Sequence, residues 1–140
     1  LFLLDIIACV SPIGIFFGRI ANFINSELVG KVTNISWGII FPNIDMVARH
    51  PSQIYEALLE GIVLFFILNI FIFKKNYKTG SCSFLFLIFY GLFRIFSEIF
   101  REPDVQLGYL FNFFSMGTIL SFLMIISGII IFVFIRKNEI

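Results

Sequence analysis

Three clusters of polar side chains interrupt an otherwise apolar sequence, and their residue types are suited to binding an anionic group. They are GRIANFINSELVG at residues 18–30, RHPSQIYE at residues 49–56, and a third cluster that begins at Tyr90. Polar and ionisable groups at membrane depth are costly, and they usually mark a pathway, a bound headgroup or chemistry. A guanidinium group binds phosphate through two N–H groups and stays charged when it is desolvated. The clusters therefore predict a site rather than only a fold.

The third cluster has the spacing of one helix face. Tyr90, Arg94 and Glu98 follow each other at intervals of four residues, and Arg101 comes three residues later. Residues at i, i+4 and i+8 lie on the same side of a helix. Glu98 can orient the guanidinium of Arg94, and Tyr90 can donate a hydrogen bond. A structural Arg–Glu pair between helices is the alternative, but the length of the polar face favours a functional site.

The first cluster has two readings of equal weight. Arg19 and Asn22 are three residues apart, so they face the same way if the preceding helix continues. Asn25 and Glu27 then continue into a turn before Gly30. The functional reading is a headgroup site, whereas the structural reading is a helix end at which Arg19 extends to lipid headgroups.

The second cluster carries the signals of a helix start. Pro51 suits the first helical position, and Glu56 in the first turns is favoured by the helix dipole. An ordinary capped helix start explains these residues as well as a site does. Glu60 adds a second carboxylate to the same face, and Arg19 or Arg94 is its expected partner. Asp5, inside the first apolar segment, also needs a partner or a position near the membrane boundary.

Composition restricts the class of protein. The chain has 140 residues, of which 59% are hydrophobic and 14% charged, whereas an ordinary soluble domain carries about 25% charged residues. We therefore expect an integral membrane protein. The net charge of +1 gives no reason to expect a nucleic-acid partner. Two cysteines and one histidine form no metal-ligand spacing or disulfide framework, so no metal and no cofactor are predicted.

Four apolar stretches, at residues 1–17, 57–73, 83–100 and 110–135, are the expected membrane spans. Each is close to the roughly 17–25 residues that cross a bilayer. We expect an all-α integral membrane protein, a bundle of about four transmembrane helices in a single domain over residues 1–140. Residues 31–46, with Trp37 and Pro42, are expected to form an irregular segment at the outer leaflet.

The basic residues predict the orientation of the bundle. KKNYKTGS at residues 74–81 lies between the second and third stretches, and Arg136 and Lys137 follow the fourth. Because basic residues prefer the cytoplasmic side, both segments and the C-terminus are placed in the cytoplasm. The three polar clusters then all fall near the outer leaflet, which predicts one shared site.

The same clusters resemble the sequence motifs of one bacterial enzyme family. GRIANFINSELVG closely resembles the GRxGNFxNxExxG signature of prolipoprotein diacylglyceryl transferases. RHPSQIYEALLEG, YGLFRIFSEIFREPDVQLG and SMGTILS resemble the following blocks of the family in the same order. The resemblance extends over essentially all 140 residues and corresponds to the C-terminal half or so of the family's chain. The chain would then be part of a larger polytopic fold in the bacterial cytoplasmic membrane.

The resemblance implies a transferase. The family moves the diacylglyceryl group of phosphatidylglycerol to the lipobox cysteine of a prolipoprotein signal peptide, forming a thioether and releasing glycerol phosphate. By this resemblance Arg19 and Arg94 are catalytic, with Tyr90 and Glu98 in support. Arg19 would also bind the headgroup phosphate, and the implied substrate-binding residues are Asn22, Glu27, Gly30, Gln53, Tyr55 and Glu56.

Two positions depart from the family pattern. Ala21 stands where the family usually has glycine, and Thr118 stands where glutamine follows Met-Gly. The family's N-terminal helices, which include a histidine implicated in catalysis, would precede Leu1. We therefore expect the isolated chain to be inactive or barely folded. The alternatives are a non-catalytic phospholipid-binding or transport protein, and an inactive truncated form.

Overall fold

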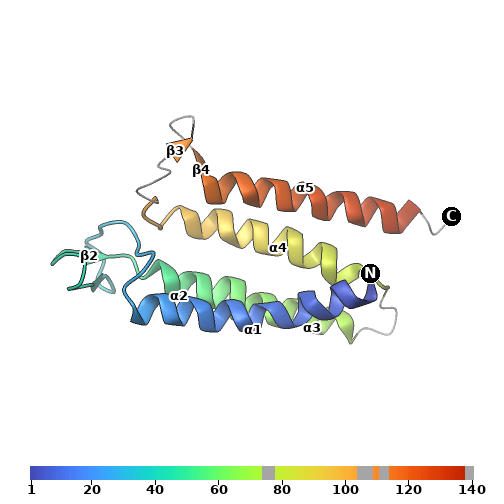
Figure 1. Cartoon of the computed structure of the whole chain (residues 1–140), viewed down its shortest axis with the longest axis horizontal. Helices are drawn as coiled ribbons and strands as arrows, with labels where there is room; N and C mark the ends of the chain where they lie inside the picture. The colour runs from blue at the N-terminus through green and yellow to red at the C-terminus, as the bar shows by residue number, and fades with distance from the viewer. Residues whose placement is uncertain (74–77, 104–108, 111–113, 138–140) are drawn as a thin grey trace.

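Four long helical segments lie side by side in the structure, a computed structural model that describes residues 1–73, 78–103, 109–110 and 114–137 (Figure 1). The first is α1 (Phe2–Ile24). The second is a continuous run of α2 (Ser52–Glu56), η1 (Ala57–Val63, a π-helix) and α3 (Leu64–Ile72). The others are α4 (Ser81–Glu98) and α5 (Met116–Lys137). Each segment is long and apolar enough to cross a membrane, so the expected bundle of membrane helices is confirmed.

The bounds of these helices differ from those of the apolar stretches. α1 continues to Ile24 rather than ending at residue 17, and the second segment begins at Ser52 rather than at residue 57. α5 begins at Met116, whereas its apolar stretch begins at residue 110. Polar side chains lower local hydropathy but do not stop a helix when they find partners inside the bundle. As a result Arg19 and Glu56 both lie on helices.

Apolar contacts hold the bundle together toward the end at which α1 and α4 begin. Leu64 and Leu68 of the second segment are fully buried, and they form a core with Ala8, Cys9 and Cys82. α4 packs against α5 at two glycines. A Cβ atom on Gly91 would lie 2.7 Å from the Ile125 side chain, and one on Gly128 would lie 2.8 Å from that of Ile88. Small residues of this kind allow membrane helices to approach closely.

A buried carboxylate joins α1 to the start of α4. Asp5 is fully buried, and its Oδ1 accepts hydrogen bonds from the Ser83 backbone N–H at 2.8 Å and from Ser83 Oγ at 2.6 Å. Its Oδ2 accepts the Gly80 N–H at 2.5 Å. The first N–H groups of a helix have no partner within the helix. Asp5 supplies that partner from a different helix, which answers the expectation that it needs one.

The segment between α1 and α2, residues 25–51, is largely irregular and lies at one end of the bundle (Figure 1). We call this segment the head. In it β1 (Ile39–Ile40) pairs antiparallel with β2 (Ala48–Arg49). Isolated bridges join Val32 to Arg49 and Gly30 to Arg101, so the chain around Gly30 lies between β2 and the residues that follow α4. A Cβ atom on Gly30 would overlap the backbone carbonyl oxygen of His50. The chain at residue 30 can therefore lie this close to residue 50 only because glycine has no side chain.

A second hairpin precedes α5, in which β3 (Tyr109–Leu110) pairs with β4 (Phe114–Ser115). Residues 74–77 of the basic segment KKNYKTGS and residues 104–108 of the motif after α4 lie outside the described residues. The head, the end of α1 and the end of α4 share one end of the bundle, and the start of α1 and the end of α5 lie at the other (Figure 1). The three polar clusters are therefore at the same end.

Candidate functional site

The carboxylate of Glu56 contacts three arginines that come from different parts of the chain. Glu56 is the last residue of α2 and is fully buried. Its Oε1 accepts a hydrogen bond from Arg94 Nη1 at 2.7 Å, and its Oε2 lies 3.0 Å from Arg19 Nε. Arg101 Nη1, just beyond α4, is 3.8 Å from Oε1. One glutamate thus fixes side chains from α1, from α4 and from the segment after α4.

Glu60 supplies a second buried carboxylate to the same cluster. Its Oε2 accepts a hydrogen bond from Arg19 Nη2 at 3.3 Å, and its Oε1 lies 3.8 Å from Arg94 Nη1. Glu60 lies within η1, and π-helical turns occur frequently at functional sites. The sequence left open whether Arg19 or Arg94 pairs with these carboxylates. In the structure, both arginines contact both glutamates.

The predicted face of α4 contributes a third carboxylate. Arg94 Nη2 lies 2.8 Å from Glu98 Oε2, as expected for residues four apart on a helix. Arg94 therefore holds Glu56 with one terminal nitrogen and Glu98 with the other. This two-point attachment fixes the plane of the guanidinium group. The described part of the cluster contains Arg19, Arg94, Arg101, Glu56, Glu60 and Glu98, whose formal charges balance.

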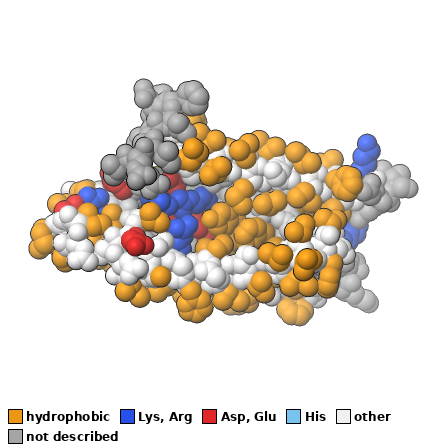
Figure 2. All heavy atoms as spheres, in the orientation of Figure 1, with side chains coloured by type: hydrophobic (Ala, Val, Ile, Leu, Met, Phe, Trp, Pro, Cys, Tyr) orange, Lys and Arg blue, Asp and Glu red, His pale blue; other side chains and the backbone are white. Residues whose placement is uncertain are grey.

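A hollow of about 210 Å³ gives access to the cluster. It is lined by Ile15, Gly18, Arg19, Asn22 and Tyr90. The Arg19 side chain is 15% exposed, whereas those of Glu56 and Glu60 are fully buried. Figure 2 shows basic side chains at the surface of the bundle near the head, with acidic side chains beside them and apolar side chains along the rest of the helices. Arg19 is thus the most exposed member of the cluster, and Glu56 and Glu60 lie beneath it.

The remaining predicted site residues lie in or beneath the head, outside the hollow. Glu27 is exposed, and its backbone carbonyl accepts a hydrogen bond from the Nε2 of buried Gln53 at 2.7 Å. The Tyr55 hydroxyl accepts a hydrogen bond from Trp37 Nε1 at 2.9 Å and lies 3.3 Å from His50 Nδ1. Tyr55, Gln53 and the backbone of Glu27 therefore fasten the head to the start of α2.

Two members of the cluster were not among the predicted site residues. Glu60 comes four residues after Glu56, which places both on one helix face, but that spacing alone does not show that Glu60 reaches Arg19. Arg101 is 6% exposed, and its place follows from the bridge between its backbone and Gly30. A contact between residues so far apart in sequence has no local signal. Gly30 thus acts on the site through its backbone, by placing Arg101 near Glu56.

Ion pairs also tie the head to the end of α4. Arg49 Nη2 lies 2.6 Å from Asp45 Oδ2, and Arg49 Nη1 donates a hydrogen bond to the Gly30 carbonyl at 3.1 Å. Arg49 Nη1 is also 3.5 Å from Glu102 Oε2. The hydrogen bond from Arg49 lowers the pKa of Asp45, and the same contact raises the pKa of Arg49. Arg49 therefore joins Asp45 and the backbone of Gly30 to Glu102 in the segment after α4.

The family follows from comparison with known proteins. The model of the family "Prolipoprotein diacylglyceryl transferase" matches residues 1–134. The chain belongs to the prolipoprotein diacylglyceryl transferase family. This confirms the family predicted from the motifs, and the structure is that of a multi-pass membrane protein of this family.

Curated relatives in Rickettsia carry the name phosphatidylglycerol–prolipoprotein diacylglyceryl transferase. The protein of Rickettsia bellii strain OSU 85-389 is 61% identical over 129 residues, which is 91% of this chain and 49% of the relative. The protein of Rickettsia akari is 60% identical over 128 residues, covering 90% of this chain and 49% of the relative. The chain therefore spans about half the length of the curated relatives it matches.

Proposed function

We propose that the full-length protein containing this chain transfers the diacylglyceryl group of phosphatidylglycerol to the lipobox cysteine of prolipoproteins. The observation that carries the proposal is the cluster in which Glu56 holds Arg19, Arg94 and Arg101 beside a hollow within the membrane helices. Charged side chains within membrane-spanning helices usually mark a functional site, and an anionic headgroup fits the arginine that is open to the hollow. Family membership and the names of the Rickettsia relatives support the same activity.

The arginines would act on the leaving group. A cysteine thiolate attacks the glycerol carbon attached to the phosphate; the new S–C bond forms the thioether, and the C–O bond breaks to release glycerol phosphate. Negative charge grows on the phosphate as that bond breaks. Donors already fixed in place stabilise such charge at little reorganisation cost. Arg19, which is open to the hollow, is proposed to bind the phosphate, with Arg94 as the second cation.

The remaining predicted site residues would hold the headgroup and the guanidinium groups in position. Tyr90 and Asn22 line the hollow and can donate hydrogen bonds to the headgroup. Glu56 and Glu98 are engaged by arginines, so we assign them to holding the guanidinium groups rather than to accepting the thiol proton. Glu27, Gly30, Gln53 and Tyr55 contribute by fixing the head over the cluster.

We also propose that the site lies near the outer leaflet of the bacterial cytoplasmic membrane, with the C-terminus in the cytoplasm. Lys78 and Arg136 line a common hollow at the end of the bundle that lies opposite the head. Basic residues prefer the cytoplasmic side. The test is a cysteine introduced at Lys78, which should resist membrane-impermeant thiol reagents in intact cells. Labelling from outside the cell would show that the orientation is the opposite of the one proposed.

A phospholipid-binding or transport protein is the alternative, because the same arginines could bind headgroups without chemistry. The experiment that separates the two is diacylglyceryl transfer from phosphatidylglycerol to a lipobox peptide. It should compare this chain with a version extended to the length of the relatives. We expect the thioether product from the extended form. If neither form makes product while both are folded and bind phosphatidylglycerol, the alternative is favoured. If the chain alone is active, the residues named here suffice.

A further inference from the structure

We infer that Glu60 is a positioning residue that orients Arg19 toward the phosphate, an inference that rests on the proposed transferase function. The juxtaposition that carries it is a fully buried carboxylate between the guanidinium groups of Arg19 and Arg94. Glu60 is not proposed to touch the substrate. Its role is to fix the one arginine of the cluster that is most open to the hollow.

Arg19 is attached at two points, and Glu60 supplies one of them. Glu56 Oε2 lies 3.0 Å from Nε, and Glu60 Oε2 accepts a hydrogen bond from Nη2 at 3.3 Å. A single contact at Nε would leave the guanidinium free to tilt, whereas contacts at two nitrogens fix its plane. Arg94 has its own two-point attachment through Glu56 and Glu98. Glu60 therefore acts mainly on Arg19.

The helix that carries Glu60 is fixed against α1 at the next residue. A Cβ atom on Gly61 would lie 2.7 Å from Phe16 Cβ and 3.1 Å from Phe16 Cα. Phe16 precedes Arg19 by three residues, which is about 4.5 Å along the helix axis. The close contact of Gly61 with Phe16 thus sets the separation of the two helices beside the Arg19–Glu60 pair.

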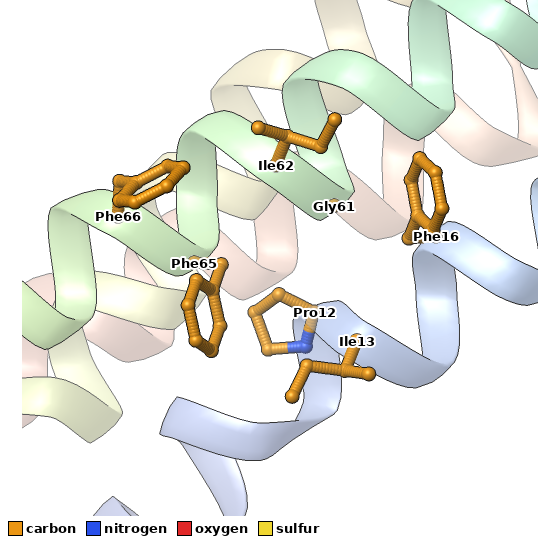
Figure 3. A pocket seen from close by; sticks show the side chains of 7 residues that line it. All are labelled: Pro12, Ile13, Phe16, Gly61, Ile62, Phe65 and Phe66. Atoms are coloured by element: carbon orange, nitrogen blue, oxygen red, sulfur yellow. The ribbon is translucent and has the colours of Figure 1, made fainter.

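The interface between α1 and the second segment is less tightly packed on the side of this contact that lies away from Arg19 and Glu60. An apolar hollow of about 160 Å³ lies between α1 and the second segment (Figure 3). Its lining consists of Pro12, Ile13, Phe16, Gly61, Ile62, Phe65 and Phe66. Packing is therefore tight at Gly61 and looser beside it. A change at Gly61 should alter the distance between Glu60 and Arg19 without changing any charge.

The first test replaces the carboxylate in the full-length protein. Glu60→Gln keeps the shape of the side chain but removes its charge, and Glu60→Asp keeps the charge but shortens the reach. A misplacement of about 1 Å at a reacting group can lower a rate by about 10²-fold. We expect kcat for transfer to fall by about that factor in Glu60→Gln and by less in Glu60→Asp. KM for phosphatidylglycerol should change by less than about threefold, because Arg19 and its charge remain.

The second test alters geometry alone. Gly61→Ala should also lower kcat at nearly constant KM. Its matched control is Gly128→Ala, since a Cβ there would be equally crowded, at 2.8 Å from Ile88 Cγ1 and 3.0 Å from the Phe84 carbonyl oxygen. That site lies between α4 and α5, away from the cluster. We expect Gly128→Ala to lower the thermal midpoint of the purified protein while leaving kcat per folded molecule unchanged.

The outcomes distinguish this inference from the function on which it rests. Wild-type kcat in folded Glu60→Gln and Gly61→Ala would overturn the positioning role. An equal loss of kcat in Gly128→Ala would also overturn it, because the effect would then be general strain. If Glu60→Gln does not fold, Glu60→Asp and Gly61→Ala carry the test. Absence of transfer by the wild-type protein would overturn the proposed function and this inference with it.

Discussion

Replacement of Arg94 by lysine tests whether the cluster needs a guanidinium group or only a positive charge. Arg94 Nη1 lies 2.7 Å from Glu56 Oε1, and its Nη2 lies 2.8 Å from Glu98 Oε2. The two carboxylates come from different helices. Lysine offers one compact ammonium group in place of a planar fork. It can therefore stay with one carboxylate but cannot reproduce both contacts with the same geometry.

The size of the effect follows from the contact that is lost. A hydrogen bond to a charged group contributes about 1.5–3 kcal/mol. Glu56 retains Arg19, and the Glu98 side chain is 11% exposed, so neither carboxylate is left fully isolated. We therefore expect Arg94→Lys to lower the free energy of unfolding by about 2 kcal/mol. Loss of one preorganised donor at a developing negative charge should lower kcat by about 10²–10³-fold.

The assay is transfer from phosphatidylglycerol to a lipobox peptide by the full-length protein, with thermal unfolding measured on the same preparation. Arg136→Lys in the last turn of α5 is the matched control, because it makes the same change far from the cluster. The control should keep wild-type kcat. Activity within about threefold of wild type in Arg94→Lys would refute the requirement for planar two-point binding.

Further predictions address the supports of the site. Arg19→Ala should abolish transfer in protein that remains folded, and wild-type turnover would contradict its assignment to the phosphate. Asp5→Ala should lower the free energy of unfolding by about 2 kcal/mol, measured in denaturant, because α4 loses its buried N-terminal acceptor; an unchanged midpoint would refute this. Gly30→Ala should lower both activity and thermal stability, by about 1–3 kcal/mol for the latter, because its Cβ overlaps the backbone. The pKa of Asp45 is lowered by Arg49, so its stabilisation of the head is present at neutral pH and is lost as the pH falls through that lowered pKa. Limited proteolysis of the head should increase at that pH, and Asp45→Asn should weaken this pH dependence.

The sequence by itself determined the class of protein and the location of its polar groups. Apolar stretches of membrane-spanning length specify helices, because in lipid each backbone N–H and C=O must find a partner within the chain. The spacing of Arg94 and Glu98 specified a shared face, because helix geometry is local. The motifs also indicated the family.

The tertiary structure alone decided which charges meet. Helical periodicity places Glu56 and Arg94 on faces, but it does not fix the rotation and offset of one helix against another. Those depend on many apolar contacts between residues distant in sequence, such as the approach of Gly61 to Phe16. For this reason the role of Glu56 as a common partner, and the contact of Glu60 with Arg19, could not be read from spacing.

The same reason explains why some of the predicted site residues lie outside the cluster. Tyr55 belongs to the polar motif at the start of α2, yet its side chain contacts His50 and Trp37 in the head. Arg101, by contrast, joins the cluster because its backbone pairs with Gly30. Local sequence determined the types of side chain at this end of the bundle, and the packing of helices and head determined which of them share a site.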